Sequence, residues 1–247
     1  MLLFSNLNKY LLESNIYFNH IIHHTNNITV NTSPNLPNYI LDLPAIIRYF
    51  ENGQLKIESW YKNGKSHRED DLPADIDYYE NGQLFTQYWS KNNKYHREKD
   101  LPAVIDYYEN GQPEKEFWYQ NDRFHREGDL PAVIHYFENG QPKMQRWYKN
   151  SKLHREKDLP AVIYYYENGQ PEVQTWMKNG ILYREGNLPA IIEYYRNGQL
   201  QKESWYQNEI LHREGDLPAK IYYYENGQPK MQSWYKNGRR LKESWYR

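Results

Sequence analysis

The amino-acid sequence repeats itself every 29 residues over most of its length. A tetrapeptide, Asp-Leu-Pro-Ala or once Asn-Leu-Pro-Ala, and a tryptophan both recur at this spacing, which gives seven repeats. Such regularity is typical of repeat architectures, in which neighbouring units bury a shared core. The tetrapeptides begin at Asp42, Asp71, Asp100, Asp129, Asp158, Asn187 and Asp216, and the tryptophans are Trp60, Trp89, Trp118, Trp147, Trp176, Trp205 and Trp234.

The two ends of the chain depart from this period. Residues 1–41 lack the repeat, and we predict an N-terminal cap or linker there, with a short helix over residues 2–17 as one option. Residues 42–247 hold the seven repeats. The last unit is truncated, because Asn237-Gly238 leads to Trp245 without a connecting segment. We expect both ends to act as caps, since terminal units of repeat proteins are atypical.

Each repeat contains two β-rich segments joined by Asn-Gly, as at Asn52-Gly53. This dipeptide favours a two-residue type I′ turn, in which both central residues have positive φ. The turn fixes the pairing of the two strands. The pairs expected in the first repeat are Glu51 with Gln54, Phe50 with Leu55, Tyr49 with Lys56, Ile47 with Glu58, and Ala45 with Trp60.

Side-chain alternation divides this hairpin into two faces. The invariant face carries the columns of Ala45, Ile47, Tyr49, Glu58 and Trp60, which are Ala, Ile, Tyr, Glu or Gln, and Trp in every repeat. The variable face carries the columns of Ile46, Arg48, Ile57 and Ser59, which change freely. The register follows from the turn alone, yet it brings the unvarying columns together, and this agreement supports the hairpin.

The hairpins are joined by connectors, which are residues 62–73 and their equivalents. Asn63 recurs in every repeat, but the residue after it varies, so we predict a turn of a looser type there. Residues 65–69 are a candidate third strand, and Pro73 fits a strand start or a bend. The expected fold is all-β, an elongated antiparallel sheet of β-hairpin repeats about 70–100 Å long.

Two stretches resemble the MORN repeat, particularly its variant form: Trp60-Tyr61-Lys62-Asn63-Gly64 and Tyr78-Tyr79-Glu80-Asn81-Gly82. The connector sequence His-Arg-Glu-x-Asp-Leu-Pro-Ala is also similar to repeats in giant viruses of amoebae, in phages and in bacteria. The resemblance implies hairpins laid side by side, and roles in scaffolding, protein association or lipid contact. The period of 29 and the lack of a Gly-rich stretch depart from the usual MORN pattern and argue against lipid contact.

Three polar columns run through the connectors. Equivalent residues of successive repeats lie about 10 Å apart, too far for neighbouring histidines to share a metal ion whose ligands lie about 2 Å away. An active site needs unlike groups that converge at one place. We therefore expect no catalytic residue, metal or cofactor, but packed imidazoles and a ladder of Arg–carboxylate pairs. The columns are His67, His96, His125, His154 and His212, with Tyr183 in one place; Arg68, Arg97, Arg126, Arg155, Arg184 and Arg213; and Glu69, Glu98, Glu127, Glu156, Glu185 and Glu214.

His20, His23 and His24 lie outside the repeats at a spacing that could approach a metal on a helix. The same sequence fits a strand or an irregular cap equally well. No cysteine or carboxylate at ligand spacing supports a metal site there, so we predict none.

The chain is rich in aromatic residues, with 26 Tyr, 8 Trp and 7 Phe. Most fall in the columns of Tyr49, Phe50, Trp60 and Tyr61, which we interpret as scaffold. The variable face carries further ones that ignore the period. They are either filler on a half-buried face or residues that contact a partner. These candidate contact residues are Tyr88, Phe117, Tyr164 and Tyr222, together with His135.

Composition narrows the choice of partner. A net charge of −1 gives no general attraction to nucleic acid or to an anionic membrane, and no run of about 18 apolar residues is present. The leading hypothesis is a non-enzymatic repeat scaffold that binds another protein or itself, without a small-molecule substrate; the alternative is a carbohydrate-binding module that uses surface Tyr and Trp. The start lacks a basic segment, so we expect the host-cell cytoplasm or a virion as its location.

Overall fold

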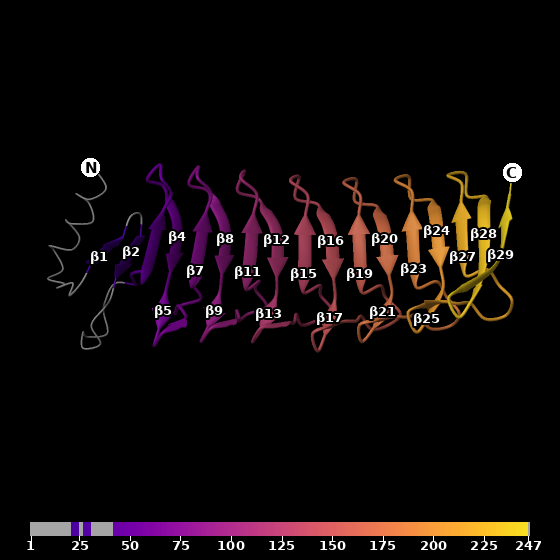
Figure 1. The fold of residues 1–247 in the computed structure, drawn as a ribbon, viewed down its shortest axis with the longest axis horizontal. Helices are drawn as coiled ribbons and strands as arrows, with labels where there is room; N and C mark the ends of the chain where they lie inside the picture. The colour runs from indigo at the N-terminus through magenta and orange to yellow at the C-terminus, as the bar shows by residue number, and fades with distance from the viewer. Residues whose placement is uncertain (1–20, 25–26, 31–41, 247) are drawn as a thin grey trace.

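The structure is a computed structural model that describes residues 21–24, 27–30 and 42–246. Within these ranges the regular secondary structure consists of β-strands. One antiparallel sheet of 17 strands runs the length of the molecule, and six two-stranded hairpins accompany it. Figure 1 shows the strands side by side in chain order, from indigo to yellow. The all-β sheet of repeated hairpins expected from the sequence is confirmed.

The main sheet is a meander in which each strand pairs with the next long strand along the chain. Each complete repeat contributes one long hairpin to it. The long strands are β1 (Ile21–His24), β2 (Asn27–Val30), β3 (Ile46–Tyr49), β4 (Leu55–Ser59), β7 (Asp75–Tyr78), β8 (Leu84–Tyr88), β11 (Val104–Tyr107), β12 (Pro113–Phe117), β15 (Val133–Tyr136), β16 (Pro142–Arg146), β19 (Val162–Tyr165), β20 (Pro171–Thr175), β23 (Ile191–Tyr194), β24 (Leu200–Ser204), β27 (Lys220–Tyr223), β28 (Pro229–Lys236) and β29 (Arg239–Trp245).

Each of the first six repeats also forms a short hairpin where only a third strand was considered. These hairpins lie in a row along one edge of the molecule (Figure 1). Backbone bonds tie neighbouring ones together, such as the Asn93 N–H to the Ser66 carbonyl at 3.0 Å. The short strands are β5 (Tyr61–Lys62), β6 (Lys65–Ser66), β9 (Ser90–Lys91), β10 (Lys94–Tyr95), β13 (Tyr119–Gln120), β14 (Arg123–Phe124), β17 (Tyr148–Lys149), β18 (Lys152–Leu153), β21 (Met177–Lys178), β22 (Ile181–Leu182), β25 (Tyr206–Gln207) and β26 (Ile210–Leu211).

The turn of the long hairpin is not of type I′. Gly53 has φ of 83°, but Asn52 does not adopt a positive φ. The Gly53 N–H donates to the Phe50 carbonyl at 3.0 Å, and the Phe50 N–H donates to Gln54 at 2.9 Å. This is a three-residue loop, in which a type I turn precedes a left-handed glycine. The Asn52 side chain accepts from the Gln54 N–H at 2.9 Å, which explains why asparagine recurs.

The predicted register nevertheless holds in the middle of the hairpin. Ile47 lies opposite Glu58, as expected, whereas Tyr49 lies opposite Leu55 and not Lys56. A β-bulge between Arg48 and Tyr49 adds one residue to β4, which compensates for the longer loop. The pairs predicted next to the turn are therefore wrong, and the assignment of residues to the two faces survives.

The turn predicted to be loose is the one with type I′ geometry. Asn63 and Gly64 have φ of 52° and 71°, and Lys62 pairs with Lys65 across this two-residue turn. Every equivalent pair also has two positive φ values, including Asn208 at 50° and Glu209 at 64°. Asparagine recurs here because it tolerates the left-handed conformation better than most residues.

The core is a thin layer on the invariant face. Trp118, Ala132 and Ile134 form one buried cluster, so that a tryptophan packs against the alanine of the following repeat. The backbone shows the same relation, since the Trp60 N–H donates to the Ala74 carbonyl at 2.7 Å. Ala45 bonds instead to Ser59, so the pair expected between Ala45 and Trp60 is not formed.

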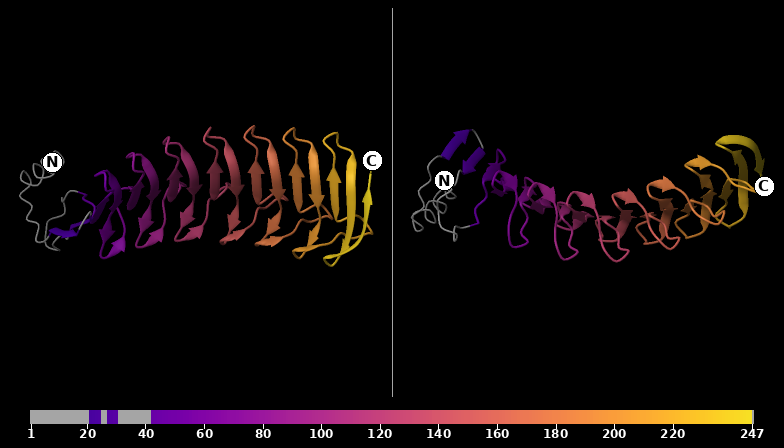
Figure 2. Two further views of the ribbon diagram at one scale, coloured as in Figure 1. Left: turned by 45° about the horizontal axis from the view of Figure 1, so that its top comes forward. Right: turned by 90° about the horizontal axis from the view of Figure 1, so that it is seen from below.

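The sheet extends beyond the repeats at both ends. β1 and β2 form a hairpin that pairs with β3, and β29 pairs with β28. The remainder of the predicted N-terminal segment lies outside the described residues, so its cap function stays a prediction. The whole sheet is elongated and bowed along its length (Figure 2).

Candidate functional site

On the invariant face, the connector of each repeat covers the tryptophan with an arginine. The Arg68 guanidinium lies 3.5 Å from the centre of the Trp60 ring, and its Nη2 lies 2.5 Å from the Asp42 carboxylate. The Trp60 Nε1–H donates to the Asp42 carbonyl at 3.3 Å. We call this arrangement the Trp–Arg–Asp triad. It recurs as Trp89–Arg97–Asp71, Trp118–Arg126–Asp100, Trp147–Arg155–Asp129 and Trp176–Arg184–Asp158.

The triad is incomplete in one repeat. Arg213 lies 3.7 Å from the centre of the Trp205 ring, but the residue that should hold its charge is Asn187. The Arg213 Nε is buried without a hydrogen-bond partner, and burial lowers the pKa of this guanidinium. The substitution of one carboxylate by an amide therefore leaves a partly buried guanidinium without its ion-pair partner, although its Nη1 donates to the Pro218 carbonyl at 3.1 Å.

Polar groups of the invariant face also bond to one another. The Tyr78 hydroxyl donates to Glu58 at 2.7 Å, and the Tyr107 hydroxyl donates to Gln87 at the same distance. Burial, followed by the bond to Glu58, raises the pKa of the Tyr78 hydroxyl. These bonds explain why the Glu58 column accepts Glu or Gln but nothing apolar.

The histidine column belongs to the same frame. His96 Nε2 lies 2.8 Å from Glu98 within one connector, and the His154 Nδ1 accepts from the Asn179 N–H of the next repeat at 3.1 Å. Among the described residues there is no group of three or more His, Asp or Glu that could hold a metal ion. His23 and His24 lie on strand β1 and not on a helix, while His20 lies outside the described residues.

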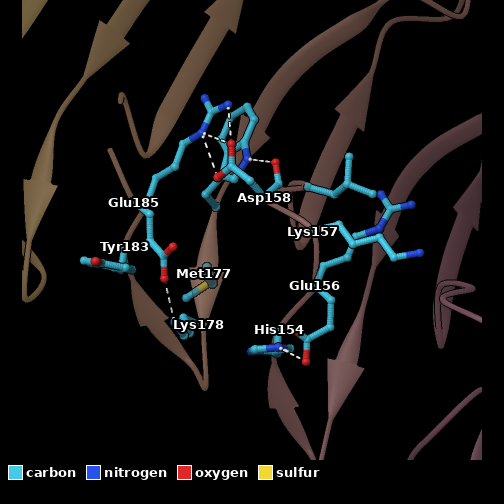
Figure 3. Close-up of a pocket in the computed structure, with 12 residues that line it drawn as sticks. His154, Glu156, Lys157, Asp158, Met177, Lys178, Tyr183 and Glu185 are labelled. Carbon is cyan, nitrogen blue, oxygen red and sulfur yellow. Dashed lines mark hydrogen bonds and ion pairs between the residues drawn. The ribbon is translucent and has the colours of Figure 1, made fainter. Parts of the chain in front are cut away.

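A pocket between two successive connectors is lined by these frame residues (Figure 3). Several of its charged groups pair with one another. Lys178 Nζ lies 2.8 Å from Glu185, and His154 Nε2 lies 3.1 Å from Glu156. The next repeat holds the same kind of pocket around Tyr183 and Trp205. Because the pocket recurs with the period and is lined by ion pairs of the frame, we assign it to the frame.

The variable face has a different character in each repeat. Its two rows of side chains can be read across the sheet from the strand register. One row runs Ile46, Ser59, Asp75, Tyr88, Val104, Phe117, Val133 and Arg146, and the other runs Arg48, Ile57, Asp77, Thr86, Asp106, Lys115, His135 and Met144.

Aromatic rings of this face and of the short hairpins form a continuous series, which we call the aromatic ladder. Ring centres are 5.8 Å apart for Tyr88 and Tyr95, 5.4 Å for Tyr95 and Tyr119, 4.5 Å for Tyr119 and Phe124, and 4.7 Å for Phe124 and Tyr148. Phe117 joins the series at 6.5 Å from Tyr119 and 5.9 Å from His135.

The structure brings three of the five candidate contact residues together. Tyr88, Phe117 and His135 belong to the aromatic ladder. Tyr164 lies beyond its end, 37% exposed, and its hydroxyl is 3.2 Å from Arg146 Nη2. Tyr222 stands apart, with its ring centre 5.7 Å from Lys202 Nζ.

Four of the seven ladder residues are not among the sequence-based candidates. Tyr95 and Phe124 lie on the second strand of the short hairpin, at the position of the candidate third strand, and Tyr119 and Tyr148 belong to a column interpreted as scaffold. One signal was available. The column that contains Ser66, Tyr95 and Phe124 is not uniform, as a purely structural column would be.

Charge differs along the variable face. Two acidic side chains, Asp75 and Asp77, precede the ladder, whereas Lys115 lies 3.4 Å from Asp106 within it. Burial, followed by the nearby Asp75 charge, raises the pKa of Asp77. Burial, with Lys115 and Arg146 nearby, lowers the pKa of His135 to about 4. The ladder therefore presents a neutral imidazole at neutral pH.

These groups can bind but are not arranged as a catalytic centre. Most polar groups of the invariant face bond to one another, and the variable face offers rings, single charges and a neutral imidazole. The surface with free binding capacity is the variable face around the aromatic ladder, which is our candidate functional site.

Comparison with known proteins agrees with the repeat architecture. The family model of the MORN repeat variant matches residues 46–63, 191–208 and 220–237. These matches start at multiples of the 29-residue period from one another, and the first covers β3, β4 and the start of the short hairpin. A search of curated proteins found no match.

No helix within the described residues is long and apolar enough to cross a membrane. The likeness to repeats of giant viruses stays an expectation. Three of the chain's seven repeats, all in the same register, match the model of the MORN repeat variant.

Proposed function

We propose that the protein is a non-enzymatic scaffold that binds another protein through the aromatic ladder of its variable face. The observation that carries this proposal is the continuity of the ladder, which runs from Tyr88 on the main sheet through the short hairpins to Tyr148. MORN repeats are generally associated with scaffolds of protein or membrane-lipid interaction.

The chemistry of the ladder suits a protein partner. Tyrosine and other aromatic residues are enriched in the centres of protein interfaces, where they bury large areas at a low cost in side-chain entropy. The Trp–Arg–Asp triads and the paired sheet hold the ladder on a rigid frame, which reduces the entropy lost on binding.

A carbohydrate-binding surface fits less well. Sugars bind to aromatic platforms whose ring faces are free. In the ladder, Tyr119, Phe124 and Tyr148 stack on one another with interplanar angles of 26° and 27°. Their faces are thus occupied by neighbouring rings, and mainly their edges are open to a ligand.

Catalysis is not part of the proposal. The MORN repeat family is a non-catalytic repeat family. The titratable groups of the connectors recur in successive repeats and pair within the frame, as Lys178 does with Glu185. A reaction centre needs unlike groups that converge on one substrate position.

Affinity capture with matched variants tests the proposal. The immobilised protein is exposed to extracts of candidate host cells, and captured proteins are quantified by mass spectrometry. Phe117→Ser removes a ring from the ladder, whereas Phe85→Ser removes a ring that is 42% exposed near the hairpin turn. Proteins captured by wild type and by Phe85→Ser should be lost with Phe117→Ser.

Folding of both variants is checked by circular dichroism, and a glycan array is probed in parallel. Equal capture by the two variants would contradict the proposed surface. Binding to glycans alone, lost with Phe117→Ser, would favour the carbohydrate alternative. Self-association that disappears with the same variant would identify the partner as a second copy of the chain.

A further inference from the structure

At the start of the aromatic ladder, three tyrosines and two carboxylates line a shallow groove on the variable face. We call it the tyrosine groove; it contains Tyr61, Tyr88, Tyr95, Asp75 and Asp77. Tyr61 is 45% exposed and Tyr95 is 38% exposed, so their rings are accessible. Tyr88 and Tyr95 stack at 5.8 Å and form one wall.

The carboxylates give the groove negative charge that no ion pair within residues 42–246 neutralises, although the charge of the nearby Lys56 acts on Asp77. Asp75 and Asp77 alternate along β7, so both point to the variable face, about 7 Å apart. Asp75 accepts a hydrogen bond from the Ser66 hydroxyl at 2.7 Å, but no cation bonds to either carboxylate within residues 42–246. Arg48, in the groove's lining, is two strands away from Asp77 and is not paired with it.

The same molecule shows which group fits between a ring and a carboxylate. In five triads an arginine stacks on an indole at 3.5–3.9 Å and pairs with an aspartate. The tyrosine groove offers the same two kinds of partner without the arginine: aspartates, and the ring of Tyr61, which is exposed and lies outside the stacked pair of Tyr88 and Tyr95. A planar guanidinium can stack on a ring and bind a carboxylate at the same time, which an ammonium does less well.

We propose that the tyrosine groove binds an arginine side chain presented by the partner protein. This inference rests on the proposed function, because it names the chemistry of the partner at one end of the ladder. Tyr95 lies 5.4 Å from Tyr119, so the groove continues into the ladder. A partner segment that places arginine in the groove can therefore lay an apolar side chain on the adjacent rings. The partner's recognition segment carries an arginine next to apolar residues.

The experiment uses the full chain and a fluorescein-labelled Gly-Ser peptide that contains one arginine flanked by leucines. A second peptide carries citrulline, which keeps the shape but not the charge. Fluorescence anisotropy should show at least about fivefold weaker binding of the citrulline peptide, as expected when a charge-assisted bond is lost. Asp77→Asn should weaken binding of the arginine peptide to a similar degree.

Matched variants separate the groove from general electrostatics. Tyr95→Leu introduces the residue found at the equivalent Leu153 and should also weaken binding. Glu80→Gln removes an exposed carboxylate outside the groove and should leave binding unchanged. Arg48→Ala removes a cation from the groove's lining that would repel the peptide's arginine, so it should strengthen binding of the arginine peptide.

Equal affinity for the two peptides, or equal effects of Asp77→Asn and Glu80→Gln, would overturn the inference, as would the absence of binding up to millimolar protein. If the arginine peptide fails while Phe117→Ser still abolishes partner capture, the proposed function stands and this inference alone is wrong. If the peptide binds as expected but capture is unaffected by Phe117→Ser, the proposed interface at the ladder is wrong instead.

Discussion

At the residue scale, one aspartate in each connector joins two repeats. The Asp158 carbonyl accepts from the Trp176 indole at 2.9 Å, while its carboxylate lies 3.0 Å from the Arg184 guanidinium. Its φ is 51°, a left-handed conformation that Asp and Asn tolerate better than most residues. Because asparagine also tolerates a positive φ, it is accepted at position 187. It lacks the carboxylate charge, so we expect the protein to be less stable than it would be with aspartate there.

Asn187→Asp should stabilise the protein by restoring the sixth triad. Asn187 has φ of 54°, within the range of the aspartates of this column, so the change needs no backbone adjustment. The new carboxylate would pair with the partly buried Arg213. We expect the free energy of unfolding to rise by about 1 kcal/mol, because the carboxylates of such pairs are half exposed. Urea unfolding measures the difference.

Asp158→Asn is the reverse control, because it removes the charge that Arg184 now contacts. It should destabilise the protein by a comparable amount. An unchanged or lower stability of Asn187→Asp, with an intact fold by circular dichroism, would show that the solvent already compensates Arg213.

His135 predicts a pH dependence of stability. Burial, with Lys115 and Arg146 nearby, lowers its pKa to about 4 from an ordinary value of 6.5. The folded state therefore favours the neutral imidazole, and the unfolded chain takes up the proton first as pH falls. The contribution of the neutral His135 to the free energy of unfolding is full above pH 6.5 and is lost progressively between about pH 6.5 and 4.

His135→Tyr, which places the residue of Tyr164 and Tyr222 in this column, should remove that part of the pH dependence. Urea unfolding of both proteins across pH 4–7.5 gives the comparison. Below this window the glutamates with lowered pKa, such as Glu156, contribute to both proteins alike. Parallel curves for the two proteins between pH 6.5 and 4 would refute the assignment.

At the element scale, the two turns of a repeat show what the sequence could and could not predict. The hairpin, the central register and the two faces follow from hydrophobic alternation and Asn-Gly. The turn types do not, because asparagine serves two purposes: Asn52 accepts a hydrogen bond from Gln54, whereas Asn63 takes a positive φ. The sequence indicates a strand at the position of Tyr95 and Phe124, but two-residue strands leave almost no alternation to detect, so the face on which these side chains lie could not be predicted.

The type I′ turn of the short hairpin predicts a stabilising substitution. Glu209 has φ of 64°, where side chains with a Cβ are strained, while Gly64, Gly180 and Gly238 occupy the equivalent position in other repeats. Glu209→Gly should therefore raise the free energy of unfolding by about 1 kcal/mol. Gly180→Glu, the reciprocal variant, should lower it by a similar amount. Stability changes of the same sign in both would contradict the turn assignment.

At the scale of the whole molecule, the protein is close to one-dimensional. Each repeat contacts its neighbours through the hydrogen bonds of the sheet, the Trp–Ala packing and the triads, and within residues 42–246 the sheet does not close on itself (Figure 2). Such proteins have a stability that is roughly a sum of unit and interface contributions. The few aliphatic residues of this hydrophilic chain are enough to form its core, because each unit packs on the next and no central core has to be filled.

This organisation predicts that a full period can be removed. Deleting residues 100–128 joins Lys99 to Asp129, so that Trp89 meets Ala132 in place of Ala103 and every remaining strand keeps its direction. The shortened protein should fold with a cooperative unfolding transition. A deletion of 15 residues, 100–114, removes β11 and reverses the direction of all strands that follow, so it should unfold the chain. Circular dichroism and urea unfolding compare the two, and a folded 15-residue deletion beside an unfolded 29-residue deletion would show that the repeats are not independent units.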